Sequence, residues 1–186
     1  MSVQLQKHYF SVDEYYRMGE AGVLPGDSRV ELIDGEVLEM SPIGKRHAGC
    51  VNRLNRLLNR NAGDLAIVTV QSPISIDDFS EPQPDLMLLK PRADFYSNSH
   101  PTPAEVLVII EVADTSLEYD RNVKLPLYAG AGIPEAWLVV LSKDFIEVHS
   151  EPKSGKYQKV QRLKRGKTLA SSTISELTLK VDDILG

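Results

Sequence analysis

The chain has 186 residues, 42% of them hydrophobic, which is enough to form one sizeable hydrophobic core. This length does not favour a second core, so we expect a single domain over residues 1–186. A formal net charge of −5 excludes attraction to nucleic acid by the field of the whole molecule, so any such contact must be local. A lone Cys50 excludes an internal disulfide, and no stretch resembles a membrane span or signal peptide, so we expect a cytoplasmic protein without membrane contact.

The first predicted element is a short helix over residues 10–18. Ser11 is followed three residues later by Glu14, the spacing of a capping box. In that motif the serine and glutamate side chains satisfy the free N–H groups of the first turn. The pair therefore predicts that the helix begins at Ser11.

A tight hairpin is predicted next, around Asp34-Gly35. Apolar and charged residues alternate over residues 29–40, and the Asp-Gly pair favours the positive backbone angles of a type I′ turn. Counting back from a two-residue turn places Glu31 opposite Leu38 on the neighbouring strand.

A helix and two strands are predicted in the next forty residues. From His47 to Arg60 apolar residues recur every three or four positions, which predicts a helix with one buried face. Residues 65–76 and 85–89 are predicted as strands, joined by an acidic and proline-marked connection over residues 77–84.

The stretch Val106–Ala113 is predicted to be a buried strand that contains one carboxylate, Glu111. Burial disfavours the charged form of a carboxylate unless a cation, a metal or dense hydrogen bonding compensates for the lost water. Glu111 is therefore the residue around which we expect a functional site.

A helix over residues 120–131 and a strand over residues 136–141 are predicted to follow. Lys124 shares a helical face with Asp120 and Tyr128 by four-residue spacing. Pro126 is expected to remove one helical hydrogen bond and to kink this helix.

The last predicted element is a polar-tipped hairpin over residues 145–160. Residues 151–186 are expected to extend the sheet or to form an oligomer contact, beyond a core over about residues 10–150. The order of elements predicts an α/β protein of the mixed α+β kind, in which helices flank a mixed β-sheet that carries N-terminal and C-terminal hairpin extensions.

Two strand carboxylates suggest a metal site. Asp85 begins one strand and Glu111 lies near the end of another, so adjacent antiparallel strands, or suitably staggered parallel ones, would bring both side chains to one edge of the sheet. Mg²⁺ usually takes only one or two protein carboxylates and completes its shell with other oxygens. The main-chain carbonyl of Val112 is a further candidate ligand, and Glu31 is a candidate to hold a second ion or to orient water.

Three more side chains are candidates for the same site. An ammonium group at Lys124 would assist the attacking water and offset the charge that develops in phosphoryl transfer. His47 is a candidate to touch phosphate or water, and equally a helix cap or packing residue. Gln71 is an accessory candidate, although a glutamine at a strand end usually satisfies backbone groups.

Several of these motifs together resemble the Uma-two family, a restriction endonuclease-like group of the PD-(D/E)XK nuclease superfamily. The resemblance covers about residues 10–150. It rests on the following residues: Arg29-Val30-Glu31-Leu32-Ile33-Asp34-Gly35-Glu36, His47, Pro84-Asp85, Glu111-Val112, Asp120-Arg121, Lys124, Tyr128 and Gly132-Ile133-Pro134-Glu135-Ala136-Trp137.

The resemblance implies a restriction endonuclease-like core and a magnesium-dependent nuclease reaction on DNA, with Asp85 and Glu111 as metal carboxylates and Mn²⁺ as a substitute ion. In the usual motif of the superfamily the lysine would stand at position 113, where this chain has Ala113. The family places it on the next helix, which here implies Lys124.

The leading hypothesis is a homo-oligomeric, metal-dependent DNA endonuclease, since a dimer would serve two strands. A second hypothesis is a catalytically silent nuclease fold that binds DNA or a protein. Glu111 paired with Lys124 or Arg121 as a structural ion pair is the plainer alternative for the cluster. A carboxylate-pair glycosidase would need stacking aromatic residues that a chain with 6% aromatic content supplies sparsely.

Overall fold

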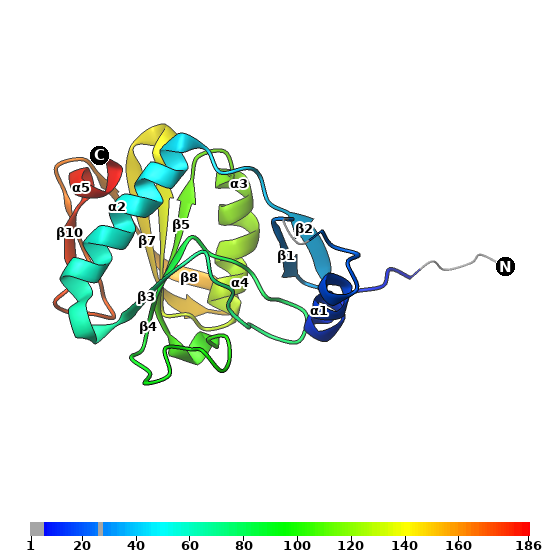
Figure 1. Cartoon of the computed structure of the whole chain (residues 1–186). Helices are drawn as coiled ribbons and strands as arrows, with labels where there is room; N and C mark the ends of the chain where they lie inside the picture. The colour runs from blue at the N-terminus through cyan, green and yellow to red at the C-terminus, as the bar shows by residue number, and fades with distance from the viewer. Residues whose placement is uncertain (1–5, 26–27) are drawn as a thin grey trace. The chain divides into compact units, whose positions relative to one another are not determined.

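The computed structural model describes residues 6–25 and 28–186 (Figure 1). No helix among these residues combines the length and the apolar character needed to cross a membrane. The chain divides into two compact units. Unit 1 holds the described residues up to Pro42 together with Ser75–Pro82, and unit 2 holds Ile43–Ile74 and Gln83–Gly186.

Unit 1 begins with helix α1 (Val12–Glu20), and the predicted capping box is confirmed. The Ser11 hydroxyl accepts the N–H of Glu14 at 3.2 Å, and the Glu14 carboxylate accepts the N–H of Ser11 at 2.9 Å. The N–H of Val12 donates to the carbonyl of Asp78 at 2.8 Å, which ties the start of the helix to the Ser75–Pro82 segment.

The predicted hairpin of unit 1 is also confirmed. Strands β1 (Val30–Ile33) and β2 (Glu36–Glu39) pair antiparallel, with Glu31 opposite Leu38. The two turn residues both have positive φ, 50° at Asp34 and 75° at Gly35, as a type I′ turn requires.

Unit 2 is built on a six-stranded mixed sheet in the order β3-β4-β5-β6-β7-β8. Only β5 and β6 run parallel; the other neighbours are antiparallel. The strands are β3 (Ile67–Val70), β4 (Leu86–Leu89), β5 (Val106–Ala113), β6 (Glu135–Val140), β7 (Phe145–Lys153) and β8 (Lys156–Lys164). A separate pair, β9 (Thr168–Ala170) and β10 (Thr178–Lys180), follows.

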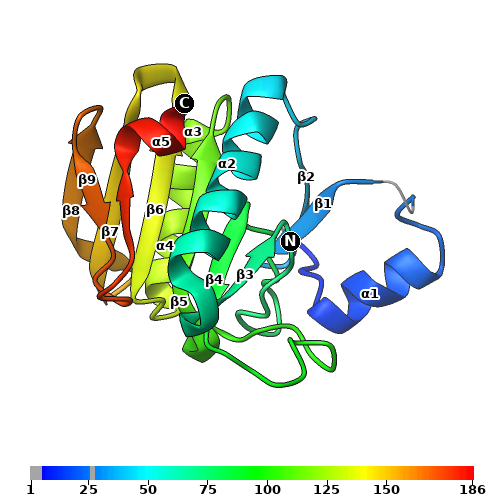
Figure 2. The same ribbon diagram turned by 60° about the vertical axis from the view of Figure 1, so that its left-hand side comes forward.

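Helices cover both faces of this sheet, as predicted (Figure 2). One face carries α2 (Lys45–Ala62) and α5 (Val181–Leu185); the other carries a helix made of α3 (Leu117–Tyr119), a π-helical turn η3 (Asp120–Lys124) and α4 (Leu125–Gly130). Short 3₁₀ turns are η1 (Gly63–Leu65), η2 (Pro103–Glu105) and η4 (Leu141–Lys143).

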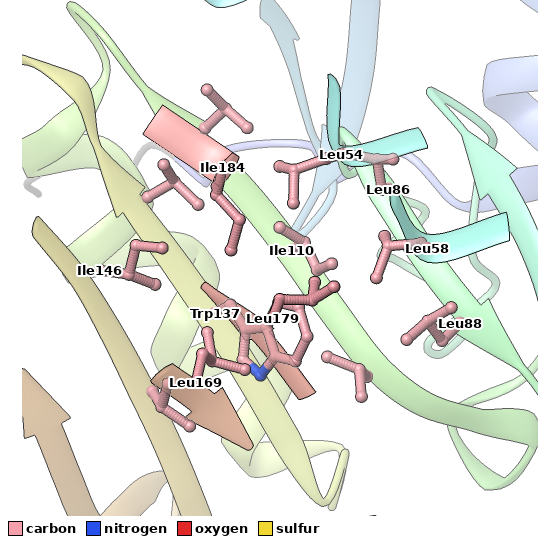
Figure 3. Packing of buried hydrophobic residues seen from close by; sticks show 14 of the residues in the cluster. Leu54, Leu58, Leu86, Leu88, Ile110, Trp137, Ile146, Leu169, Leu179 and Ile184 are labelled. Carbon is pink, nitrogen blue, oxygen red and sulfur yellow. The ribbon is translucent and has the colours of Figure 1, made fainter. Parts of the chain in front are cut away.

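The hydrophobic core of unit 2 lies between the sheet and the α2 and α5 helices (Figure 3). Leu54 and Leu58 of α2 face Ile110 and Trp137 of the sheet, and all four are fully buried. Residues after position 150 also enter this cluster: Leu163, Leu169, Ile174, Leu177, Leu179, Val181, Ile184 and Leu185. The C-terminal segment therefore supplies core side chains as well as strand β8 of the sheet.

Two predicted boundaries are wrong. The strand expected over residues 65–76 ends at Val70, because Gln71 has a φ of 47° and Pro73 has no N–H to offer a neighbouring strand. The helix expected from Asp120 begins at Leu117 and contains the π-helical turn.

Candidate active site

Strand register in unit 2 brings Asp85 beside Glu111. Strands β4 and β5 are antiparallel, and their last pair is Leu86 with Ile110. Continuing that register by one residue sets Asp85 opposite Glu111. Directly opposite residues project from the same face of a sheet with Cβ atoms about 5 Å apart.

Asp85 closes the open end of the β4–β5 ladder with its side chain. The N–H of Val112 lies beyond the last backbone pair and donates to Asp85 Oδ2 at 2.9 Å. His47 Nε2, in the first turn of α2, lies 3.0 Å from the same oxygen, and Gln71 Nε2 donates to Oδ1 at 3.4 Å. The two accessory candidates from the sequence are therefore both neighbours of Asp85.

Glu111 is almost completely buried, with 3% of its surface exposed. Its Oε1 atom accepts the hydroxyl of Tyr128 at 2.6 Å and lies 3.3 Å from Lys124 Nζ. One carboxylate oxygen is thus held by two side chains of the helix that follows β5.

The electrostatic environment of Glu111 is short of positive charge. Burial raises the pKa of Glu111 well above its usual range, and nearby Asp120 and Asp85 raise it further. Lys124 and the Tyr128 hydroxyl act in the opposite direction without cancelling the effect of burial. An additional cation would stabilise the ionised form of this group.

The π-helical turn carries Lys124, and α4, which follows it, carries Tyr128. The N–H of Leu125 donates to the carbonyl of Asp120, five residues back, and Pro126 follows without an N–H of its own. The turn thereby opens the helix just before the proline, in place of the simple kink expected there. Asp120, also buried, accepts the Ser116 hydroxyl at 2.6 Å.

Of the two ion-pair partners considered for Glu111, Lys124 is the one observed. Arg121 instead contacts Glu147 of β7 at 3.1 Å, and Arg162 of β8 contacts the same carboxylate at 2.7 Å. Burial alone would raise the pKa of Glu147, but hydrogen bonds from Arg162 and Arg121 lower it overall.

Tyr128 and Asp120 are the two members of this cluster that were not among the candidate site residues. Tyr128 was expected to be a core residue; it is fully buried, and its hydroxyl also bonds Glu111. In the sequence, Asp120 and Tyr128 are each four residues from Lys124, and this spacing already indicated that the three side chains share one face of the helix.

The oxygen-rich pair Asp85 and Glu111 fits a hard divalent cation such as Mg²⁺. No group of three or more His, Cys, Asp or Glu side chains among the described residues is arranged to hold a metal. The fit therefore rests on two carboxylates, which is the number that Mg²⁺ commonly takes from a protein. Glu31 belongs to unit 1, on β1, and its participation stays a prediction.

Comparison with known proteins adds a family and a fold relative. The model of the family Uma2, described as a putative restriction endonuclease, matches residues 12–182. The crystal structure of a putative nuclease belonging to DUF820 from Anabaena variabilis aligns with a TM-score of 0.72 and 16% sequence identity, over 95% of this chain and 97% of that chain. No curated protein matches the sequence. The expected restriction endonuclease-like fold is confirmed.

Proposed function

Because the chain belongs to the Uma2 family of putative restriction endonucleases, we propose that it is a Mg²⁺-dependent endonuclease that hydrolyses phosphodiester bonds in DNA. Asp85 and Glu111 hold the ion, with Mn²⁺ as a substitute. The observation that carries the proposal is the pairing of the buried Glu111 with Asp85 at the open end of one strand ladder.

The main-chain carbonyl of Val112 is proposed as a third ligand. A residue in an extended strand presents its N–H and its C=O to the same side. Since the N–H of Val112 donates to Asp85, its carbonyl faces the Asp85 side as well. Two carboxylates and one carbonyl would leave positions for water and phosphate oxygens.

Each side chain of the cluster has a distinct part in this proposal. When bound, Mg²⁺ supplies Lewis-acid polarisation of the phosphodiester and neutralises its charge. Lys124 assists the attacking water and stabilises the negative charge that develops on the phosphate, while Tyr128 fixes the orientation of Glu111. His47 and Gln71 hold Asp85 in place, and Glu31 is a candidate for a second ion.

A homodimer or higher homo-oligomer is part of the proposal, because hydrolysis of both strands of a duplex calls for two sites. Light scattering of the purified protein would measure this directly. A monomer that only nicks plasmid DNA would restrict the proposal to one strand.

A second candidate function is a catalytically silent nuclease fold that binds DNA or protein. The Lys124–Glu111 pair, buried and reinforced by Tyr128, favours it, because an ion pair satisfied within the protein can be structural. The two candidates differ in whether a divalent ion binds and whether DNA is cut.

Cleavage of plasmid and single-stranded DNA with Mg²⁺ or Mn²⁺ separates them. We expect the wild type to cut, and Asp85→Asn, Glu111→Gln and Lys124→Met to lose activity by at least about a hundredfold. Tyr157→Phe, which removes a buried hydroxyl on β8 away from the cluster, is the matched control and should cut normally. Equal cutting by every variant would identify a contaminant, and no Mg²⁺ binding by calorimetry would remove the chemical basis of the proposal.

A further inference from the structure

Positive charge in this acidic chain is concentrated in one segment, residues 152–175, which we call the basic segment. It contains seven basic residues and no acidic one: Lys153, Lys156, Lys159, Arg162, Lys164, Arg165 and Lys167. The other 162 residues hold 14 basic and all 26 acidic side chains. A formal charge of +7 is thus set against −12 in the remainder of the chain.

The basic segment presents this charge to solvent. All seven side chains belong to exposed residues, and the segment includes β8, which is an edge strand of the sheet. Arg162 pairs with Glu147, Arg165 with Asp144 and Asp182, and Lys159 with Glu151. The other four lysines make no ion pair with any described residue, so most of the charge is not neutralised within the protein.

Sheet register places the C-terminal part of the basic segment, from Arg162 to Lys167, at the same end of the sheet as the candidate active site. Glu111, Leu138, Glu147 and Arg162 are successive partners across β5, β6, β7 and β8. Ala113 is linked in the same way to Lys164, and β8 runs in the same direction as β5. Arg165 and Lys167 follow directly after that end of β8.

Three strand spacings separate Glu111 from Arg162, which is about 14 Å. One strand of a DNA duplex advances about 3.4 Å along the axis per nucleotide. If the reacting phosphate of a duplex lies at Glu111, the phosphate roughly four nucleotides further along the strand would therefore lie near Arg162 and Lys164.

We propose that the basic segment binds the phosphate backbone of double-stranded DNA and holds the duplex across the end of the sheet that carries Asp85 and Glu111. The proposal rests on the nuclease function proposed above and names the surface that receives its substrate. Lysines on an edge strand also discourage strand pairing between molecules. That role does not explain Arg165 and Lys167, which lie beyond the end of the strand.

The test uses two double variants of the full chain with equal net charge. Lys164→Glu/Lys167→Glu changes the site end of the basic segment, and Arg56→Glu/Lys90→Glu changes exposed basic residues elsewhere in unit 2. Fluorescence anisotropy with a 30-bp duplex in EDTA measures binding without cutting. Thermal unfolding of each variant verifies that the fold is retained.

We expect the segment variant to bind about tenfold or more weakly at 50 mM salt, with a slope of log affinity against log salt smaller by about two, because two phosphate contacts are lost. The control should bind like the wild type. Unchanged binding by the segment variant, or equal weakening of both variants, would overturn the proposal. Loss of binding to anionic phospholipid vesicles with DNA binding intact would assign the segment to a membrane instead.

The same variants separate this inference from the proposed function. Selective loss of duplex binding, with no cutting by the wild type under any metal, would support the interface and remove the nuclease. Normal cutting and binding by the segment variant would keep the nuclease and remove the interface.

Discussion

Replacing Tyr128 with phenylalanine tests how the helix controls Glu111. The change keeps the shape of a fully buried ring and removes only the hydroxyl that donates to Glu111 Oε1 at 2.6 Å. A hydrogen bond to a charged group contributes about 1.5–3 kcal/mol, which corresponds to a rise of roughly one to two units in the pKa of Glu111. Because burial already raises this pKa, a proton would compete with Mg²⁺ up to a higher pH in the variant.

Mg²⁺ binding measured by calorimetry between pH 5.5 and 8.5 provides the assay. In both proteins affinity should rise with pH as Glu111 loses its proton, and the Tyr128→Phe curve should be displaced to higher pH by one to two units. Below the pKa this displacement means about 10- to 100-fold weaker binding, and above it the two curves should converge.

Tyr157→Phe is the matched control, since the Tyr157 hydroxyl is buried without a hydrogen bond to any described residue. It should leave the Mg²⁺ curve unchanged. Superimposable curves for wild type and Tyr128→Phe would refute the role of Glu111 as a titrating ligand. A loss that is equal at every pH would point to a structural defect instead.

Three further predictions concern stability. Lys124→Met should lower the free energy of unfolding by no more than about 3 kcal/mol at pH 7 and by less than about 1 kcal/mol at pH 5. The loss is limited because Glu111 can take up a proton when Lys124 is removed, and protonation costs less free energy at the lower pH. Urea denaturation showing the same loss at pH 5 and pH 7 would contradict this. Glu135→Gln should lower the free energy of unfolding by about 2–3 kcal/mol in the same assay. All the groups that bond this buried carboxylate are hydrogen-bond donors, Trp137 Nε1 at 2.5 Å among them, so the amide NH2 of glutamine would face a donor. An unchanged free energy of unfolding would be inconsistent with this reasoning. Gly35→Ala should speed hydrogen exchange of the backbone amides in β1 and β2 about tenfold without affecting those in β5. Gly35 has a φ of +75°, and the added carbon would lie 2.6 Å from Tyr9 Cβ, so the turn would be strained. Unaltered exchange would show that the turn adapts.

Local signals in the sequence were sufficient for most elements of the fold. The Ser11 capping box and the Asp34-Gly35 turn are short-range patterns, and both have the predicted geometry. The end of β3 was missed because nothing in the apolar run before Gln71 announces a positive φ. The π-helical turn was missed for a related reason, since a proline indicates a disturbed helix without specifying how the backbone adjusts.

The site was predictable only as far as strand order could be inferred. That Asp85 and Glu111 would be neighbours required an antiparallel β4–β5 pair, which the sequence allowed without specifying. The hydrogen bond from Tyr128 depends on the rotation of a helix relative to a strand, a tertiary property beyond any spacing rule. Whether these residues act on DNA stays a prediction for the assays above.

The hydrogen bond from Val112 to Asp85 has an evolutionary consequence. The Asp85 side chain takes the place of a backbone acceptor on β4, so its removal would leave the N–H of the buried Val112 without this hydrogen bond. A homologue that has lost nuclease activity would still be selected to keep the Asp85 side chain, because that side chain stabilises the fold. Retention of an aspartate here is therefore poor grounds for inferring that a relative is catalytically competent.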